Sequence, residues 1–172
     1  MGGVIELVPT ADLPPAARTL VQAVFEDDFT DTDWDNSLGG THALAFDGAD
    51  LVGHASLVQR RLLHGGRVLR AGYVEAVAVR ADHRRRGYAS ALMEALERLL
   101  PGYDIGALSA AEAVPLYEGR GWQQWRGPTF ALTPEGIRRT EDEDGGVYVR
   151  PGSAPLDLDG DLTADWRAGD VW

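Results

Sequence analysis

The feature that most constrains this chain is a cluster of three arginines between a short apolar segment and an amphipathic one. The segment before it, Tyr73–Val79, carries three valines in a run of strand length. The segment after it, Ala89–Leu100, repeats apolar residues at helical spacing along one face. Between them, Arg84–Ala89 fits the pattern R-x-x-G-x-A. The sequence therefore predicts a strand, a basic loop and a helix in direct succession.

This loop has the chemistry of an anion site. The small residues Gly87 and Ala89 let an anionic group approach the main chain. The first turn of the following helix offers N–H groups without acceptors and a favourable dipole. An arginine cluster taken alone is equally consistent with a solvated loop. The order of strand, loop and helix favours a site for a diphosphate.

Length and composition limit the class of protein. The 172 residues suit one domain, and we expect a single domain over residues 1–172. The chain has no cysteine, which excludes disulfides, thiolate metal sites and a cysteine nucleophile. The four histidines lack metal-ligand spacing, so we expect no metal. No window reaches the apolar length of a membrane span, and Val4–Val8 is too short for a signal peptide, so we expect a cytoplasmic protein without membrane contact.

The distribution of charge indicates what the chain binds. A net charge of −11 argues against nucleic acid as a partner. One basic loop suits an anionic cofactor, whereas several acidic segments suit a cationic substrate. Each acidic run taken singly is better explained as a solubilising loop. The acidic segments are Glu26–Asp35, Glu141–Asp144 and Asp157–Asp170.

The chain before the arginine loop predicts a strand, a helix and a three-stranded meander. Val4–Pro9 has a strand pattern, and Asp12 is placed to cap a helix that opens at Pro14-Pro15 and ends near Phe25. The segment Glu26–Asp35 carries too much charge for a buried element. Its aromatic residues beside carboxylates would suit a polyamine or an aminosugar, and a solvated loop is the alternative. The meander strands are expected at Thr41–Phe46, Leu51–Leu63 and Arg67–Arg80.

Further elements are expected after the amphipathic helix. A strand is predicted at Tyr103–Leu108 and a helix at Glu112–Glu118. Trp125–Leu132 and Val147–Arg150 are expected to form a terminal hairpin. The tail from Pro151 contains two tryptophans, and frayed tails rarely do. We therefore expect the tail to pack onto the domain.

A second informative segment follows the predicted strand at Tyr103–Leu108. Leu116–Trp122 fits the pattern L-Y-x-x-x-G-W. Taken alone, it is better explained as a tyrosine packed at a helix end with a glycine cap. Its place after the arginine loop gives it more weight, because two short patterns in order are more specific than either.

These two patterns resemble motifs A and B of the Gcn5-related N-acetyltransferases (GNAT). In motif A, which Arg84–Ala89 and the preceding acid Glu75 resemble, the loop holds the pyrophosphate of acetyl-CoA. In motif B, which Leu116–Trp122 resembles, the tyrosine hydroxyl lies near the coenzyme sulfur. The resemblance implies an α+β (mixed α/β) fold with a central, mostly antiparallel twisted sheet that is splayed at the cofactor site and flanked by helices.

Longer segments resemble the aminoglycoside 2′-N-acetyltransferases within that superfamily. This resemblance implies acetyl transfer from acetyl-CoA, by direct attack in a ternary complex, to the 2′-amine of aminoglycosides such as gentamicin, tobramycin or kanamycin. It also implies antibiotic resistance, a homodimer, and a tail packed into the substrate site. The segments that carry it are Asp28–Trp34, Leu38–Leu44, Gln59–Leu62, Gly72–Asp82, Gly106–Ser109 and Asp165–Trp172.

The resemblance also implies roles for individual residues. Glu75 would act as a base through water, and Tyr117 as an acid toward the departing thiolate. The cofactor would be bound by Val77, Ala78, Val79, Arg84, Arg85, Arg86, Gly87, Tyr88, Ala89 and Ser109. The aminosugar would be bound by Asp28, Asp33, Glu75, Ser109, Asp144, Asp170 and the carboxylate of Trp172.

The proposed chemistry is physically reasonable without the family. An ammonium cannot attack a thioester until a base removes a proton, and a carboxylate on an apolar strand suits that task. Two alternatives stay open: an acetyltransferase for another amine, such as a protein N-terminus or a polyamine, and a non-catalytic acyl-CoA-binding or drug-sequestering protein. The presence of both Glu75 and Tyr117 counts against the second alternative.

Overall fold

The computed structural model describes residues 3–111 and 114–172 and contains two compact units. The first unit comprises Met1–Val58 and Val74–Leu99, and the second comprises Gln59–Tyr73 and Leu100–Trp172. Strands β3 (Asp50–His64) and β4 (Arg67–Val79) contribute to both units. A single domain over the whole chain therefore stays a prediction.

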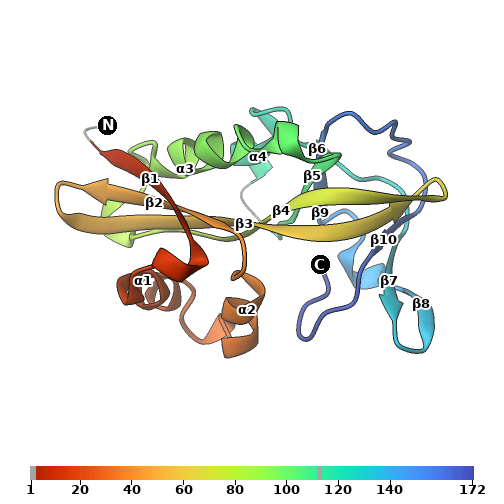
Figure 1. Ribbon diagram of the computed structural model, residues 1–172, viewed down its shortest axis with the longest axis horizontal. Helices are drawn as coiled ribbons and strands as arrows, with labels where there is room; N and C mark the ends of the chain where they lie inside the picture. Colours follow the sequence, from red (N-terminus) through yellow and green to blue (C-terminus); the bar gives the residue numbers. More distant parts are fainter. Residues whose placement is uncertain (1–2, 112–113) are drawn as a thin grey trace. The chain divides into compact units, whose positions relative to one another are not determined.

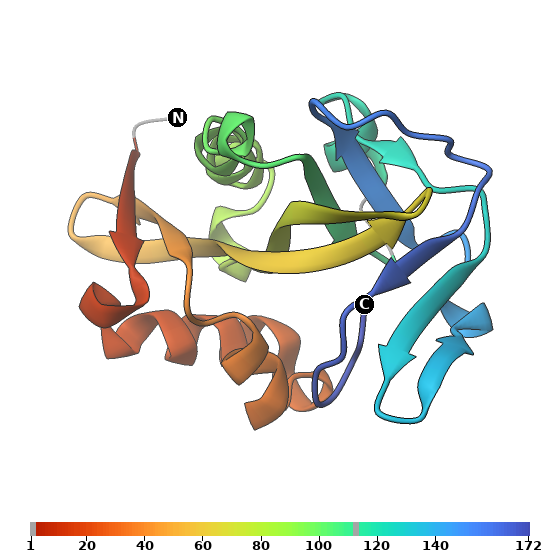
Figure 2. The same cartoon turned by 45° about the vertical axis from the view of Figure 1, so that its right-hand side comes forward.

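The first unit is an antiparallel sheet covered by helices on both faces. Strand β1 (Val4–Pro9) pairs with β2 (Thr41–Asp47), and β2 pairs with β3. Figures 1 and 2 show α1 (Pro15–Phe25) and α2 (Asp31–Asn36) on one face of this sheet. The helix α3 (Tyr88–Glu97) lies on the other face.

Side chains alternate between the two faces of this sheet, so each face has its own contacts. On one face Leu44 packs with Leu20 of α1 and Trp34 of α2. On the other face, a Cβ at Gly53 would meet Leu92 of α3 at 3.0 Å, which is tighter than ordinary contact. Glycine at this position therefore lets α3 lie close to β3.

One expectation for the first unit, the cap at Asp12, is wrong. Helix α1 begins at Pro15 with Pro14 as its N-cap, while Asp12 lies in a separate 3-10 turn. The acidic segment after α1 forms a 3-10 turn and the helix α2, so the alternative of a solvated loop does not hold. The Thr30 hydroxyl accepts from the Asp33 N–H at 3.1 Å, and the Asp33 carboxylate accepts from the Thr30 N–H at 2.8 Å. This reciprocal capping box starts α2 in spite of its charge.

The second unit is an extended sheet with mostly antiparallel pairs. Its strands run in the order β6-β9-β5-β4-β3-β10-β7-β8, and only the pairs β4–β5 and β10–β7 are recorded as parallel among the described residues. The α+β fold with a mostly antiparallel sheet is thus confirmed. The elements are β5 (Ile105–Ser109), α4 (Val114–Glu118), β6 (Gln123–Gln124), β7 (Thr129–Thr133), β8 (Gly136–Arg139), β9 (Val147–Pro151) and β10 (Leu162–Ala164).

The predicted meander is confirmed by β2, β3 and β4, but the predicted terminal hairpin is wrong. Strand β9 pairs with β5 and β6, whereas β7 pairs with β8 and β10. The predicted helix at Glu112–Glu118 corresponds to α4, and its first two residues lie outside the described residues. Across residues 3–111 and 114–172, no helix is long and apolar enough to cross a membrane.

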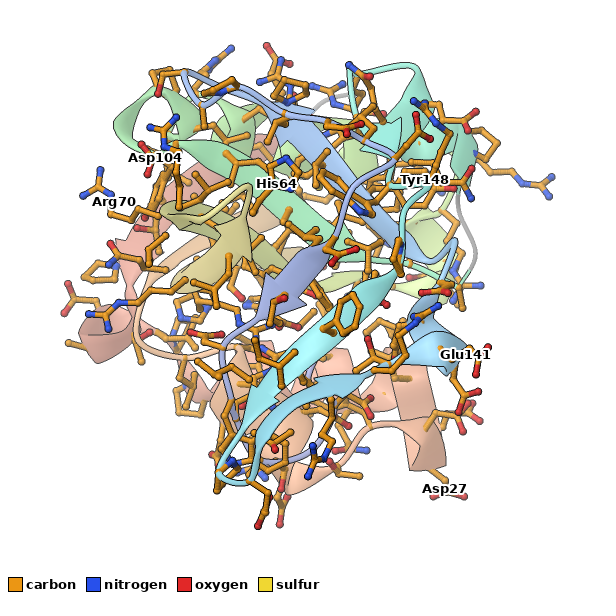
Figure 3. All side chains as sticks on the ribbon, turned by 90° about the vertical axis from the view of Figure 1, so that its right-hand side faces the viewer. Asp27, His64, Arg70, Asp104, Glu141 and Tyr148 are labelled. Carbon is orange, nitrogen blue, oxygen red and sulfur yellow. The ribbon has the colours of Figure 1, made fainter. Side chains whose placement is uncertain are left out.

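The tail packs onto the second unit, as expected. His64 donates from Nδ1 to the Asp161 carbonyl at 2.8 Å and accepts from the Asp157 N–H at 3.1 Å. Further along, the Arg60 guanidinium donates to the Asp165 carboxylate at 2.9 Å. Figure 3 looks onto this unit, with His64 in its interior and Glu141 at its rim. Trp172 is only 4% exposed, so the end of the tail is packed as well.

Candidate functional site

The arginine loop joins β4 to α3 in the first unit. Gly87 precedes α3 with a φ of +85°, a left-handed conformation that glycine adopts at little cost. A Cβ at Gly87 would meet no atom within 4 Å, so the space beside the main chain is open. Within the described chain no side chain caps the start of α3, which leaves its first N–H groups available. The arginine side chains Arg84–Arg86 are exposed beside this opening.

The residues around the loop therefore fit a diphosphate. Open main chain, an uncapped helix start and three guanidinium groups together favour an anion with two phosphates. Ala89 is half-buried in the first turn of α3, and Tyr88 is buried with 3% exposure. On β4, Val77 and Val79 are half-buried while Ala78 is 2% exposed.

The ring of His83, the residue before the arginine loop, is held between two carboxylates. Its Nδ1 lies 2.8 Å from Asp82 Oδ1, and its Nε2 lies 3.0 Å from Asp47 Oδ2. Carboxylates only accept, so both ring nitrogens carry hydrogen and the ring is an imidazolium. The bonds to Asp82 and Asp47 raise the pKa of His83 above its ordinary value. The Arg80 guanidinium also binds Asp82, which ties the end of β4 to the same cluster.

Glu75 is half-buried on β4, next to a distortion of the strand. Ala76 has a φ of +50°, a left-handed conformation that costs a residue with a Cβ about 1–3 kcal/mol. Two side chains of β3 hold the adjoining carbonyls: Ser56 donates to the Glu75 carbonyl at 3.4 Å, and His54 to the Ala76 carbonyl at 2.9 Å. A local distortion of a strand can re-aim the neighbouring side chain.

Tyr117 lies on α4 in the second unit, in an aromatic cluster. Its ring centroid is 6.5 Å from that of Trp122 and 6.4 Å from that of Tyr148. The side chain is 7% exposed, and burial raises the pKa of its phenol. Tyr117 therefore keeps its proton at neutral pH and is able to donate it.

Asp28 and Asp33, which are predicted to bind the aminosugar, differ in how many hydrogen bonds they already accept. Asp28 is exposed at the end of a 3-10 turn, Glu26–Asp28. Asp33 accepts from both the N–H and the hydroxyl of Thr30, so part of its hydrogen-bonding capacity stabilises α2. Asp28 is therefore the more available of the two for a ligand.

Asp144 is engaged in structural contacts in the second unit. Its Oδ1 accepts from the Thr129 N–H at 3.1 Å and from the Thr129 hydroxyl at 2.9 Å. The Arg139 guanidinium binds both carboxylate oxygens, at 2.8 and 2.5 Å. The hydrogen bond from the Arg139 guanidinium, more than any other contact, holds the pKa of Asp144 well below its usual range. This neutralised acid has little attraction left for a cationic ligand.

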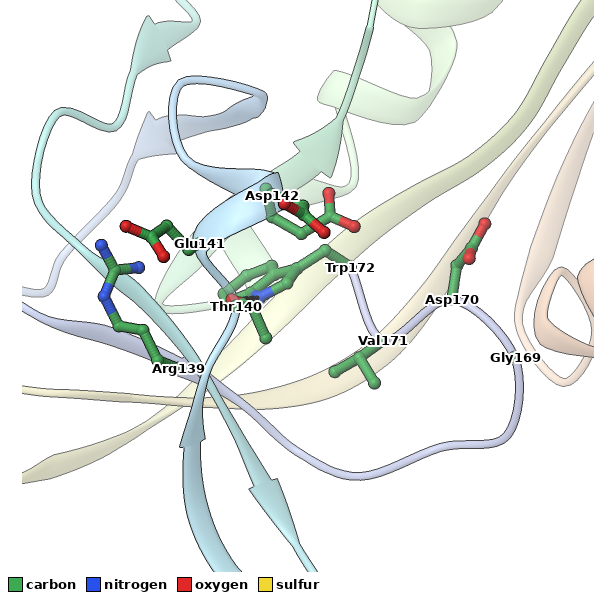
Figure 4. Close-up of a pocket in the computed structure, with 9 residues that line it drawn as sticks. Arg139, Thr140, Glu141, Asp142, Gly169, Asp170, Val171 and Trp172 are labelled. Atoms are coloured by element: carbon green, nitrogen blue, oxygen red, sulfur yellow. Dashed lines mark hydrogen bonds between the residues drawn. The ribbon is translucent and has the colours of Figure 1, made fainter.

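The neighbouring acid Glu143 has the opposite surroundings. It lines a pocket of about 420 Å³ together with Glu141, Asp142, Asp170 and Trp172 (Figure 4). Burial, then the charges of Asp170 and Asp142, raise the pKa of Glu143. A hydrogen bond from Ser109 opposes these effects and favours the charged carboxylate. The pocket therefore concentrates negative charge that a cation would relieve.

The tail forms one wall of this acidic pocket. The Trp172 indole donates to the Thr140 hydroxyl at 3.0 Å (Figure 4). Arg167 donates to the Asp170 carbonyl at 2.7 Å and to the main-chain oxygen of Trp172 at 3.3 Å. These contacts hold the exposed Asp170 carboxylate at the pocket.

The second unit thus brings Ser109, Asp170 and Trp172 around Glu143, a residue that the sequence reasoning missed. The acidic run Glu141–Asp144 was the available signal. It did not show which carboxylate an arginine neutralises, because that depends on the pairing of β7 with β8. Among the described residues there is no group of three His, Asp or Glu placed to hold a metal ion.

Comparison with known proteins identifies relatives of the chain. Residues 9–125 match the profile of the family described as "Acetyltransferase (GNAT) domain". A protein of Mycolicibacterium fortuitum named "Aminoglycoside 2'-N-acetyltransferase" is 47% identical over an alignment that covers 99% of this chain and 94% of the relative.

Solved structures share the fold. Eis1 from Mycobacterium abscessus is 22% identical with a TM-score of 0.61, over 74% of this chain and 33% of that protein. The chain thus spans about a third of its length. YhbS from Escherichia coli, a GNAT family N-acetyltransferase solved in complex with CoA, is 18% identical with a TM-score of 0.60, over 94% of this chain and 89% of that protein.

The His83 cluster predicts a pH dependence of stability. The folded pKa of His83 is raised above the ordinary value of 6.5, so its contribution is fully present below pH 6.5 and is lost as the pH rises through the folded pKa. The variant His83→Phe keeps the ring beside Tyr88 but lacks the charge. We expect its deficit in melting temperature to be largest at pH 6 and to shrink toward pH 9. A deficit that stays constant over this range would contradict the ionic role.

Proposed function

The chain belongs to the family of GNAT acetyltransferases, and from this premise we propose that it transfers the acetyl group of acetyl-CoA to the 2′-amine of aminoglycosides, conferring resistance to them. The observation that carries the proposal is the identity to the Mycolicibacterium relative over nearly the whole chain. The acidic pocket of Glu143 and Asp170 supports it, since aminoglycosides are polycations. A homodimer and a cytoplasmic location stay predictions.

The donor would be held by the first unit. Arg84–Arg86, the open main chain at Gly87 and the start of α3 would bind the pyrophosphate of acetyl-CoA, and the strand Val77–Val79 would lie along its pantetheine arm. The bound cofactor supplies an acyl thioester for attack by an amine. The bonds of His83 to Asp82 and Asp47 anchor the chain immediately before the loop.

The acceptor would be held by acids of the second unit. Glu143 and Asp170 would bind its ammonium groups through charge-assisted hydrogen bonds. Substrate-binding roles for Asp28 and Asp33 stay predictions. Each buried bond of this kind is worth about 1.5–3 kcal/mol. We assign Asp144 a supporting role, because Arg139 already neutralises it.

Proton transfer would fall to Glu75 and Tyr117. The Glu75 carboxylate would accept a proton from the acceptor ammonium through a water, which frees the nitrogen lone pair. The Tyr117 phenol would hold a proton for the departing sulfur. The raised pKa of that phenol supports this role, because the group stays protonated before transfer.

The substrate assignment is tested with two acceptors that differ at one group. Kanamycin B carries an amine at the 2′ position, where kanamycin A carries a hydroxyl. We expect release of free CoA thiol, which a thiol reagent detects, with kanamycin B and only background release with kanamycin A. Equal release with both acceptors would contradict the 2′ assignment. Release of CoA thiol only with polyamines or peptide N-termini would favour one of those amines as the substrate instead of an aminoglycoside.

The catalytic assignment predicts a large and specific loss of turnover. Removal of a proton-transfer group typically costs ~10²–10⁴ in rate, so Glu75→Gln and Tyr117→Phe should lower kcat by this amount. Acetyl-CoA affinity, measured by calorimetry, should be nearly unchanged. The controls Glu94→Gln, on the exposed face of α3, and Tyr103→Phe should keep normal turnover. If Glu75→Gln or Tyr117→Phe keeps a normal kcat, the residue substituted does not transfer a proton and serves only in packing.

The pocket assignment separates two neighbouring acids. Loss of one charge-assisted bond of about 1.5–3 kcal/mol corresponds to about ten- to hundredfold in affinity, so Glu143→Gln should raise the kanamycin B KM by that factor. Asp144→Asn should instead lower the melting temperature, because it breaks contacts with Thr129 and Arg139. If Asp144→Asn raises KM and Glu143→Gln does not, the two roles are reversed.

A further inference from the structure

A chain of hydrogen bonds crosses the interior of the first unit and ends beside Glu75. The Thr10 hydroxyl lies 2.7 Å from Nε2 of His42, and Nδ1 of His42 lies 2.9 Å from Nε2 of His54. Nδ1 of His54 in turn lies 2.9 Å from the Ala76 carbonyl oxygen. Both imidazoles are 0% exposed. The chain therefore links β2, β3 and β4 inside the core.

The donors in this chain are determined by its two ends. The Ala76 carbonyl only accepts, so Nδ1 of His54 carries the hydrogen. In the neutral ring Nε2 of His54 then accepts, and Nδ1 of His42 donates to it. Nε2 of His42 accepts from the Thr10 hydroxyl, whose oxygen accepts from the Gly39 N–H at 2.8 Å. Every group along the chain thus has one assigned direction.

Burial keeps both rings neutral, which this arrangement requires. Burial lowers the pKa of both histidines, that of His54 to about 4. The rings lie on the face of the sheet covered by α1 and α2, where the Trp34 ring lies 5.8 Å from that of His54. A charged pair in this apolar layer would be unfavourable.

The end of the chain coincides with the strained residue of β4. Ala76, at a φ of +50°, needs surroundings that hold it in the left-handed region. His54 binds its carbonyl, and Ser56 binds the carbonyl of Glu75 immediately before it. A one-residue distortion in a strand decides which way the adjoining side chain points.

We propose that the Thr10–His42–His54 chain is a positioning device for Glu75, because it holds the Ala76 main chain in the conformation that aims this carboxylate. His54 is the positioning residue, and His42 and Thr10 fix the orientation of its ring. The inference rests on the proposed role of Glu75 as the base. The other part of the proposal, that His54 holds the main chain of Ala76, does not depend on that role.

The test compares two variants of His54. His54→Leu removes the donor to the Ala76 carbonyl, whereas His54→Asn places an amide N–H where Nδ1 stood. A small misplacement of a catalytic group costs up to about a hundredfold in rate, so we expect His54→Leu to lower kcat with kanamycin B by about ten- to hundredfold. Acetyl-CoA affinity should stay within about twofold, and His54→Asn should recover most of the turnover. Should His54→Leu not fold, Thr10→Val removes the hydroxyl donor at the far end and should lower kcat by a smaller factor.

A matched control separates positioning from stability. His64 is also a buried histidine with two main-chain partners, but it belongs to the second unit and its partners are Asp157 and Asp161 of the tail. His64→Leu should lower the melting temperature and keep kcat. If His54→Leu and Thr10→Val keep wild-type kcat, or if His54→Asn is no better than His54→Leu, the positioning role is wrong.

A second measurement does not depend on turnover. Glycine adopts a φ of +50° without strain, so Ala76→Gly should reduce the need for the His54 bond. We expect His54→Leu to lower the melting temperature less in the Ala76→Gly background than in the wild type. Equal losses would overturn the coupling. If the wild type turns over no amine acceptor, the proposed function fails, and this double-variant comparison alone decides whether His54 holds Ala76.

Discussion

The left-handed conformation of Ala76 within β4 is the constraint on which the proposed donor site and base depend. It separates Glu75 from Val77–Val79, so one strand presents a carboxylate on one side of the distortion and the proposed cofactor surface on the other. A conformation that costs about 1–3 kcal/mol persists only where neighbouring groups hold it. Ser56 and His54 supply that support from β3, through the carbonyls of two successive residues.

The basic site and the acidic pocket belong to different units, and the chain as a whole is strongly acidic. In the first unit the exposed Arg84–Arg86 lie beside an uncapped helix start and attract an anion. In the second unit Glu143 and Asp170 raise the negative potential of one pocket, while Arg139 neutralises the adjoining Asp144. The two kinds of site suit the two reactants of an acetyl transfer to a polycation, an anionic coenzyme and a cationic acceptor.

Local sequence patterns predicted the strand–loop–helix around Gly87 and the meander of β2, β3 and β4, because periodicity and turn residues act over short distances. Two features depended on contacts that local patterns do not encode. Strand β9 paired with β5 instead of β7, and two histidines on different strands met inside the core. The choice of Glu143 over Asp144 likewise required knowing where the Arg139 side chain lies. The capping box of Thr30, by contrast, is a local pattern of two residues three positions apart, which the charge of the segment obscured.

The central claim is that this GNAT acetyltransferase acetylates one defined amine of an aminoglycoside. The most direct measurement is the NMR spectrum of the product formed from kanamycin B and one equivalent of acetyl-CoA. The account predicts a single monoacetylated product, with the acetyl group on the 2′ nitrogen. Acetylation at another amine, a mixture of sites, or recovery of unmodified kanamycin B would contradict it.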